Sequence, residues 1–554
     1  MKRIRLLAVL CLLSLLLSLS AFGTAGSSGE LHHEGTRIRV FQTTDIHGYL
    51  VDTSSGEEST YQYRLAYIAA QVNQARADSS YADVLLLDSG DVYQGAPVSN
   101  LLNGAALRAA LDAMDYDAVG LGNHDFDWGV TGYGADEDAT IPAYELGEFS
   151  GDPDIPVLAT GLLDAETGER VDFTRDYVLV EKAGYTIALI GYICDYSSAI
   201  IAERIAPYTI EGDYESFSAR VEEINALEEP DITVVVAHEE AETVAEALDP
   251  EQVDLVVGGH RHKGASGTAS NGLAYIQGGY NGQGYATATL VITKAGEVFV
   301  EDCLYTQITQ DAELLYDTPE NAENLDETVL AISRAACEAV RDDMEEVLGY
   351  IDTPIDQTET GDNGATYAGN WFSGLMLRAT QDQGTVAAFY NSGGIRTNFR
   401  LSKGENTRIL TAGDIYTIAP FGNSLYVYEL TGAELAQQLV NGMTSGNYGD
   451  QMSGLTFEYT VSDSGKNQSY SIVSITLDDG TAVNPTDTDT LYRVCTSSYS
   501  GTLAGGVFAD KEPLIPAAEA PIDNITMIDL LREEAAQNDG LISVDTGVRG
   551  TRVG

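Results

Sequence analysis

Five of the seven histidines follow short apolar runs that are typical of buried strands. These runs end at about residues 43, 121, 237 and 257, with helical patterns such as 64–77 between them. The five histidines are His47, His124, His238, His260 and His262. Because α/β sheets place their chemistry at strand ends, the pattern predicts an α/β fold with one shared site at a sheet edge.

The stretch Gly120–Gly129 holds the densest group of polar side chains. Gly122 permits a sharp turn, and Asn123, His124 and Asp127 follow it. Asn123 offers a neutral oxygen to a hard cation, and Asp127 can orient the ring of His124. Taken alone, this stretch fits a polar turn with a capping asparagine equally well. The other strand-end histidines favour a functional site.

The five histidines accompany Asp45, Asp91 and Asn123, which completes a pattern typical of a metal centre. Imidazole nitrogen with carboxylate and carboxamide oxygen, and no cysteine, suits Mn, Zn, Fe or Co. Two ligand sets can share one carboxylate, and Asp91 is the natural bridge. The sequence therefore predicts two divalent metal ions. His32 and His33 lie in a polar lead-in and have no partner pattern.

The balance of charge limits the partners of this chain. It has 29 basic and 85 acidic residues, a formal net charge of −56. Binding a polyanion requires dense Lys and Arg, so a nucleic-acid polymer or an acidic membrane surface is disfavoured. A phosphorylated substrate must be attracted by a local positive charge, which bound metal ions can supply.

The first 25 residues resemble a secretory signal peptide. A basic start precedes fourteen apolar residues and a small-residue cleavage site at 23–25, which predicts a secreted, extracellular or periplasmic protein. An uncleaved anchor is the alternative, and we expect no membrane segment after cleavage. The later cysteines are widely spaced without a CxxC pattern, which predicts buried free thiols at Cys194, Cys303, Cys337 and Cys495.

The pattern of strand-like and helical segments changes along the sequence, which predicts two domains. The alternating strands and helices occupy residues 36–310. Apolar residues at helical spacing over 325–349, ending at Gly349, predict a connecting helix. Residues 350–554 have more strand-like runs and turns and no histidine, which predicts a separate second domain.

The order of the polar clusters resembles a known signature. The matching segments are Asp45-x-His47, Gly90-Asp91, Gly122-Asn123-His124-Asp125, His238 and Gly259-His260-x-His262. They match, in this order, the calcineurin-like dimetal phosphoesterases. In the second half, Asn391–Arg396, Pro420–Asn423 and Tyr492–Tyr499 resemble the C-terminal nucleotide-binding domain of the 5′-nucleotidase family. That family includes 5′-nucleotidases, UDP-sugar hydrolases and 2′,3′-cyclic phosphodiesterases, and the resemblance covers residues 37–548.

The resemblance implies a four-layer α/β/β/α sandwich followed by an α+β domain, and it implies roles for the clusters. One metal would be held by Asp45, His47, Asp91 and His262, and the other by Asp91, Asn123, His238 and His260. His124, oriented by Asp127, would contact the phosphate and serve the leaving group. Asp88 and Asp125 would lie outside the ligand set.

The resemblance also implies a substrate pocket in the second domain. Phe421 and Tyr499 would sandwich a base, although each also fits an ordinary core position. Arg396 would grip a phosphate or ribose oxygen through its planar fork, with Asn391 and Arg378 as further pocket residues. The family usually has a ribose-binding Asp where this chain has Val507, and Asp510 is out of register.

These observations together predict a secreted dimetal phosphohydrolase that acts on nucleotides in a cleft between two domains. The alternatives on the same scaffold are a 2′,3′-cyclic phosphodiesterase, a nucleotide-sugar hydrolase and a sulfur-ester hydrolase. The alternative outside enzymes is a surface protein that binds nucleosides without turning them over.

Overall fold

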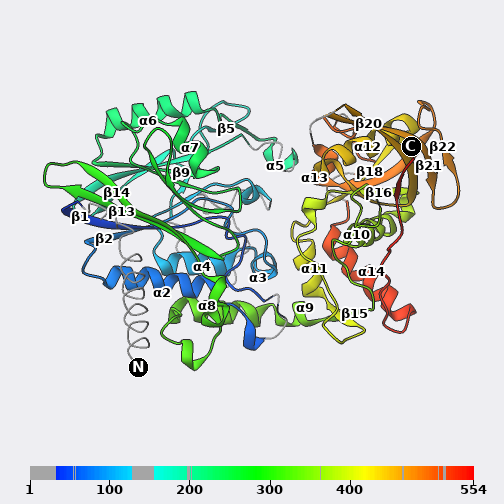
Figure 1. Ribbon diagram of the computed structural model, residues 1–554, viewed down its shortest axis with the longest axis horizontal. Coiled ribbons are helices and arrows are strands. Elements are labelled where there is room, and N and C mark those ends of the chain that lie inside the picture. The colour runs from blue at the N-terminus through cyan, green and yellow to red at the C-terminus, as the bar shows by residue number, and fades with distance from the viewer. Residues whose placement is uncertain are drawn as a thin grey trace, which may run out of the picture.

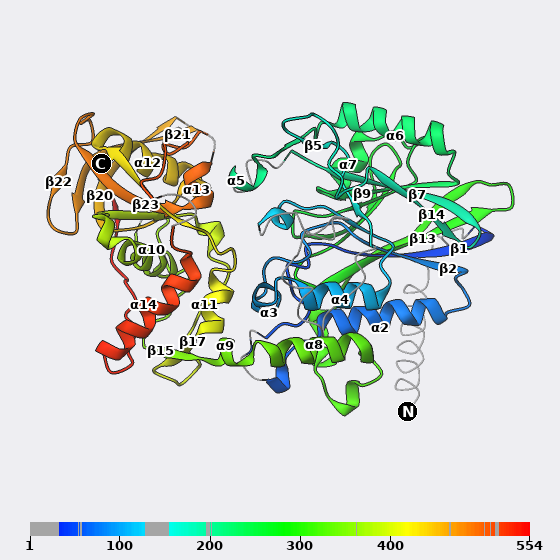
Figure 2. The same cartoon turned by 180° about the vertical axis from the view of Figure 1, so that it is seen from behind.

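The computed structural model describes residues 33–553 except 54, 56–57, 128–154, 196–199, 201, 362, 465–466, 504, 510 and 516–519. Two domains lie side by side and are joined along one end (Figures 1 and 2). The first runs from β1 to α8 and the second from β15 to β24. The predicted signal peptide and Asp510 lie outside the described residues.

Two six-stranded sheets form the centre of the first domain, counted over the described residues. The first sheet has the order β14 (Val298–Gln307), β13 (Gly284–Thr293), β1 (Gly35–Thr43), β2 (Asp83–Asp88), β3 (Ala118–Gly120) and β4 (Val157–Leu158). The second has the order β11 (Gly264–Thr268), β12 (Ala274–Gly278), β10 (Leu255–Gly258), β9 (Ile232–His238), β7 (Tyr185–Ile193) and β6 (Tyr177–Lys182). A separate pair joins β5 (Leu162–Asp164) to β8 (Tyr208–Ile210).

The two sheets pack face to face and helices cover their outer faces. Leu85 and Leu87 of β2 meet Leu189 of β7 and Val234 of β9 in a fully buried core. One face carries α2 (Arg64–Ala77), α4 (Ala105–Met114) and α8 (Glu327–Ala339), and the other carries α6 (Tyr214–Glu228) and α7 (Ala241–Ala247) (Figure 1). Strands buried on both faces are almost wholly apolar, as the central strands β2, β9 and β10 are. The predicted α/β/β/α sandwich is confirmed.

Strand direction brings the site together. β1, β2, β3 and β4 are parallel neighbours, as are β7, β9, β10 and β12. Their carboxyl ends therefore lie at one edge of each sheet, and the loops that leave them carry the predicted ligands. Hydrogen bonding continues past the strands: the Asp45 N–H donates to the Gly90 carbonyl and the His47 N–H to the Asp91 carbonyl, both at 2.9 Å.

The connection between the domains differs from the prediction. The helix expected over 325–349 stops at Ala339, α9 covers Arg341–Glu345, and Val347–Ile351 form strand β15. Val347 is 62% exposed and pairs with Thr411 of β17 (Arg408–Thr411). Pairing with a strand some sixty residues away overrides the local helical spacing of the apolar residues.

The second domain has two four-stranded sheets within the described residues. They comprise β18 (Leu425–Thr431), β23 (Leu491–Ser497), β16 (Ala387–Tyr390) and β19 (Gln451–Ser453), and β22 (Ala482–Val483), β21 (Asn467–Leu477), β20 (Leu455–Ser464) and β24 (Gly550–Arg552). The longer helices are α10 (Tyr367–Ala379), α11 (Ala412–Ile418), α12 (Gly432–Thr444) and α14 (Asp523–Gln537). This is the α+β organisation that the sequence predicts.

Short helices complete the chain. They are α3 (Pro97–Leu101), α5 (Ala202–Ile205), α13 (Ser498–Thr502), η1 (Glu58–Thr60), η2 (His124–Phe126), η5 (Thr309–Leu315), η6 (Pro319–Asn321), η7 (Gln381–Gln383), η8 (Ser392–Gly394) and η9 (Gly446–Tyr448). Among the described helices, none combines the length and apolar content that crossing a membrane requires. The four described cysteines carry free thiols, as predicted, but only Cys495 is fully buried.

Packing between the two large sheets should dominate the stability of the first domain. Leu189 is 0% exposed between them. We expect Leu189→Ala to lower the free energy of unfolding by about 2–5 kcal/mol, because it leaves a cavity in a closed core. The control is Leu179→Ala on neighbouring β6, where the leucine is 41% exposed and a loss within about 0.5 kcal/mol is expected. Urea titrations that gave equal losses would contradict this.

Candidate active site

Within the described residues, two clusters of potential metal ligands lie at the carboxyl ends of the strands. One comprises Asp45, His47 and His262, the other Asp91, His238 and His260, and the ligand atoms of each lie within 4.8 Å of one another. All six residues come from loops or strand ends that the sequence singles out. The structure therefore brings together side chains that are more than two hundred residues apart in the chain.

The first cluster brings together ligand atoms whose lone pairs can bind a cation. The Nε2 atoms of His47 and His262 are 3.0 Å apart. The Nδ1 of His47 lies 2.9 Å from the Gln94 carbonyl, so Nδ1 carries the proton and Nε2 is free to bind a cation. Asp45 Oδ1 lies 3.5 Å from His262 Nε2. Burial of the imidazole lowers the pKa of His262 to about 4, which keeps it neutral.

Asn123 joins the second cluster. Its Oδ1 lies 3.2 Å from His238 Nε2 and 3.0 Å from His260 Nδ1. The Nδ1 of His238 donates to the Ser89 carbonyl at 2.8 Å, which turns Nε2 toward the cluster. Two imidazole nitrogens, a carboxamide oxygen and a carboxylate therefore converge on one point.

Asp91 links the two clusters through one oxygen. Its Oδ2 lies 3.8 Å from His47 Nε2 and 3.2 Å from His238 Nε2. Burial would raise the pKa of Asp91, but His238 and His124 hold it well below its usual range. Burial lowers the pKa of His238, and Asp91 outweighs this and raises it to about 10. Buried nitrogen and oxygen ligand atoms around a shared carboxylate form an environment that fits two divalent cations.

The backbone of the ligand residues is strained. Asp45, His47, Asp91, His260 and His262 all have positive φ, between 48° and 66°. Few non-glycine residues adopt this left-handed region, and such outliers cluster at functional sites, where the surrounding fold must hold them. The loops are therefore shaped for the position of the ligands rather than for the lowest local energy.

Two glycines allow the ligand loops to approach one another. A Cβ on Gly122 would lie 2.2 Å from Asp91 Oδ1, and one on Gly259 would lie 2.2 Å from Thr44 Oγ1. Asp125 supports the same region from outside the clusters, since its carboxylate accepts the N–H groups of Gly122 at 2.8 Å and Asp91 at 3.1 Å.

His124 lies beside the clusters and is fixed from two sides. Its Nδ1 lies 2.9 Å from Asp127 Oδ2, and its backbone N–H donates to Asp91 Oδ1 at 2.7 Å. Burial lowers the pKa of His124, but the Asp127 and Asp91 carboxylates raise it to about 9. The raised pKa favours the protonated ring, which is the state that a proton donor requires.

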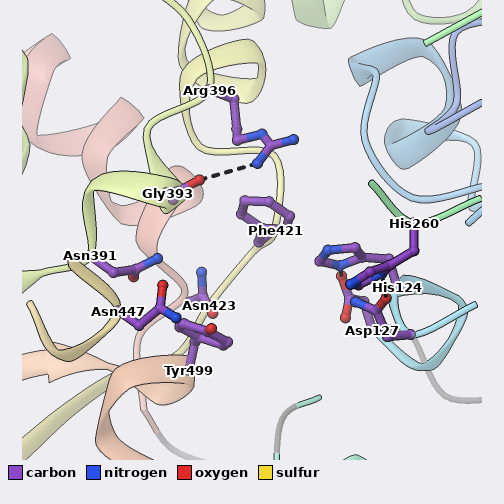
Figure 3. Close-up of a pocket in the computed structure, with 12 residues that line it drawn as sticks. His124, Asp127, His260, Asn391, Gly393, Arg396, Phe421, Asn423, Asn447 and Tyr499 are labelled. Carbon is purple, nitrogen blue, oxygen red and sulfur yellow. Dashed lines mark hydrogen bonds and ion pairs between the residues drawn. The ribbon is translucent and has the colours of Figure 1, made fainter. Parts of the chain in front are cut away.

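The second domain closes the site opposite His124. A cavity of about 240 Å³ is lined by His124, Asp127 and His260 from the first domain and by Arg396, Phe421, Tyr499 and three asparagines from the second (Figure 3). The Phe421 ring stacks on His124, with centroids 5.2 Å apart and planes 26° apart. The Arg396 guanidinium lies 5.4 Å from the Phe421 centroid.

Arg378 does not belong to this cavity, contrary to the sequence prediction. Its guanidinium pairs with Glu534 and donates to the Leu530 carbonyl on α14. It lines a separate pocket of about 220 Å³ with Asn370 and Trp371. The acidic partner lies more than 150 residues away in the sequence, so the local motif around Arg378 could not reveal the pairing.

Several of the residues that line the cavity were not identified as site residues from the sequence. Asn423 and Asn447 line the cavity beside Asn391, and Figure 3 shows all three carboxamides grouped near Tyr499. Asn423 belongs to the recognised Pro420–Asn423 segment, but Asn447 lies in a turn-rich loop with no distinguishing signal. Tyr280 stacks on His262 with centroids 5.0 Å apart.

The four-layer sandwich, the linked clusters and the oriented histidine define a metallophosphoesterase. Residues 38–264 match the family Calcineurin-like phosphoesterase, and residues 347–510 match the family 5′-nucleotidase, C-terminal domain. The chain belongs to the 5′-nucleotidase family of calcineurin-like phosphoesterases and is a phosphoric ester hydrolase.

Relatives of known name support the same family. Cell wall protein Lmo0130 of Listeria monocytogenes is 26% identical, covering 92% of this chain and 69% of the relative. The trifunctional nucleotide phosphoesterase protein YfkN of Bacillus subtilis is also 26% identical over 85% of this chain, which spans only 32% of that longer protein. The crystal structure of a 5′-nucleotidase precursor from Thermus thermophilus shares the fold, with a TM-score of 0.68, 22% identity, and coverage of 93% of this chain and 99% of that one.

Loss of the shared carboxylate should affect both clusters together. We expect Asp91→Asn to lower bound metal, measured by elemental analysis after dialysis, from two ions per chain to fewer than one, with nearly complete loss of turnover. The control is Asp254→Asn, because this half-buried carboxylate accepts the Thr233 N–H at the opposite ends of the strands. Full metal content in Asp91→Asn would contradict the bridging role.

Proposed function

We propose that the protein is a secreted phosphohydrolase that removes phosphate from nucleotides by means of two divalent metal ions in a cleft between its domains. The observation that carries the proposal is the cavity that joins His124 and the clusters to Phe421, Tyr499 and Arg396. A protein that only bound nucleosides would not require two buried ligand clusters. Secretion rests on the first 25 residues and on the relative named as a cell wall protein.

The residues suggest a division of labour. Arg396 would bind a phosphate or ribose oxygen, which brings a positive charge into the cavity of a strongly acidic protein. His124 would give its Nε2 proton to the leaving oxygen while Asp127 holds Nδ1. Asp45, His47, Asp91, Asn123, His238, His260 and His262 would hold the metals. Two divalent cations, when bound, supply Lewis-acid stabilisation of the phosphoryl group and lower the pKa of water.

The base and the sugar would be recognised differently. Phe421 and Tyr499 line the same cavity and can stack on a base, while the carboxamides of Asn391, Asn423 and Asn447 offer hydrogen bonds at its edge. Val507, at the position of the family's ribose-binding Asp, packs against the hydrophobic core of the second domain. We infer that stacking fixes the nucleotide more strongly than ribose contacts do.

A second candidate substrate is a nucleotide sugar. An adjoining cavity of about 320 Å³ is lined by His47, Tyr49 and Tyr280 and shares Arg396 and Phe421 with the first. A group beyond a second phosphate could occupy it, whereas a nucleoside monophosphate would leave it to water.

A phosphate-release screen tests both candidates. Purified protein would receive Mn, Zn, Co, Fe or Mg singly and be offered nucleotides, cyclic nucleotides, nucleotide sugars and a small aryl phosphate. We expect turnover of nucleoside monophosphates with at least one metal. Hydrolysis of the aryl phosphate with no nucleotide or nucleotide sugar turned over would overturn the nucleotide proposal. Binding of nucleosides without any phosphate release would support the non-enzyme alternative.

The proton donor can be tested separately from the metals. We expect His124→Ala to retain metal and lose about 100-fold or more in kcat, the scale of general acid catalysis. Asp127→Asn should show a smaller loss, because it disturbs the orientation and pKa of the ring rather than removing it. Equal kcat for wild type and His124→Ala, with metal content verified, would refute the role.

Stacking without a ribose carboxylate predicts weak discrimination between AMP and deoxy-AMP. We expect their kcat/KM values to differ by less than tenfold, which corresponds to about 1.4 kcal/mol. Phe421→Ala should raise KM for AMP about tenfold or more, since base stacking contributes about 1–3 kcal/mol, and should spare the aryl phosphate. A strong preference of the wild type for AMP would mean that another residue binds the ribose, with Asp510 the first to mutate.

A further inference from the structure

One carbonyl of the second domain is held by two side-chain amides of the first. The Pro420 carbonyl accepts hydrogen bonds from Gln94 Nε2 at 3.1 Å and from Asn100 Nδ2 at 2.6 Å. Gln94 lies in the loop that follows β2, and Asn100 lies on α3 a few residues later. The next residue after Pro420 is Phe421, whose ring stacks on His124.

The Gln94 side chain makes this contact while one of its own polar atoms has no hydrogen-bond partner among the described residues. Its side chain is 1% exposed, yet its Oε1 is buried and has no hydrogen-bond partner among the described residues. A buried acceptor without a partner destabilises the domain that contains it. The favourable side-chain hydrogen bond of Gln94 is therefore made to the other domain, which argues for a role outside the fold of its own domain.

Gln94 also contacts the metal-ligand cluster. Its backbone carbonyl lies 2.9 Å from Nδ1 of His47 and so fixes the ring that presents Nε2 to the first cluster. One residue thus orients a predicted metal ligand through its main chain and the Phe421 loop through its side chain.

Asn100 is fixed before it meets the second domain. Its Oδ1 accepts the Gly95 N–H at 2.9 Å, and its Nδ2 also donates to the Gly95 carbonyl at 3.1 Å. The two hydrogen bonds to Gly95 hold the amide in place, and Nδ2 also donates to the Pro420 carbonyl. A donor held in this way loses little conformational entropy when the domains meet.

We propose that Gln94 and Asn100 are positioning residues that set the Phe421 ring, and through it the nucleobase, relative to His124 and the metal clusters. This inference rests on the proposed nucleotide hydrolysis and adds the means by which base binding in one domain is aligned with chemistry in the other. The two amides act through the Pro420 carbonyl and do not touch the base.

A double-mutant cycle tests whether the amides act through Phe421. Gln94→Met keeps the length of the side chain and the carbonyl that His47 contacts, but removes the donor. We expect it to lower kcat/KM for a nucleotide about threefold to tenfold, mainly through KM, the effect of losing one hydrogen bond. In a Phe421→Ala background the same change should have no further effect. Turnover of the small aryl phosphate should stay within about twofold.

The control for this cycle removes comparable hydrogen bonds elsewhere in the first domain. Asn225 Nδ2 donates to the Gln252 carbonyl at 2.7 Å, away from the second domain. Asn225→Ala should leave KM for the nucleotide unchanged in both backgrounds. An undiminished effect of Gln94→Met in Phe421→Ala, or an equal loss for the aryl phosphate, would overturn the proposal.

A spectroscopic measurement separates this inference from the proposed function. Fluorophenylalanine can replace the thirteen phenylalanines of the sequence, and the Phe421 fluorine signal is assigned by its loss in Phe421→Ala. Because Phe421 stacks on His124, its signal should move toward the solvent value in Gln94→Met/Asn100→Asp. The Asp side chain can still accept the Gly95 N–H, but it loses the amide that donates to the Gly95 and Pro420 carbonyls. An unmoved signal would overturn the positioning role. A moved signal in a protein that hydrolyses no nucleotide would reject only the proposed function.

Discussion

The carboxylate of Asp91 is the contact on which the site depends. One oxygen lies between the histidines of both clusters, and the other accepts the backbone N–H of His124. Asp91 can take this place because Gly122 leaves room beside it and Asp125 holds its main chain in a left-handed turn. One side chain therefore contacts both clusters and the main chain of His124.

The second domain supplies what this centre lacks. The two clusters consist of carboxylates and imidazoles, and the net charge of the protein as a whole repels anions. Phe421 brings an aromatic face into stacking contact with His124, and Arg396 places a cation 5.4 Å from the centroid of the Phe421 ring. Residues of both domains line the cavity, and the amides proposed to position Phe421 lie at the contact between the domains.

Much of this arrangement is predictable from the sequence, because its signals are local. Asp45, His47 and His238 stand where apolar strands stop, and parallel strands bring such ends together whatever their separation in the chain. The remainder depends on partners distant in sequence. The pairing of Val347 with Thr411 turned an expected helix into a strand, and Glu534 engages Arg378 away from the cavity. Gln94 orients His47 through a backbone carbonyl, which any residue could provide and no motif records.

Five candidate ligand residues have a left-handed backbone. At these positions, a substitution that improves stability would lower activity. Holding an L-residue in that region costs about 1–2 kcal/mol, which glycine avoids. A selection for heat tolerance alone would reward glycine at these positions, and each such change would remove a candidate metal ligand. A search for thermostable variants of this enzyme should therefore leave these loops unchanged. It should make substitutions in the cores of the two domains and on their exposed helices.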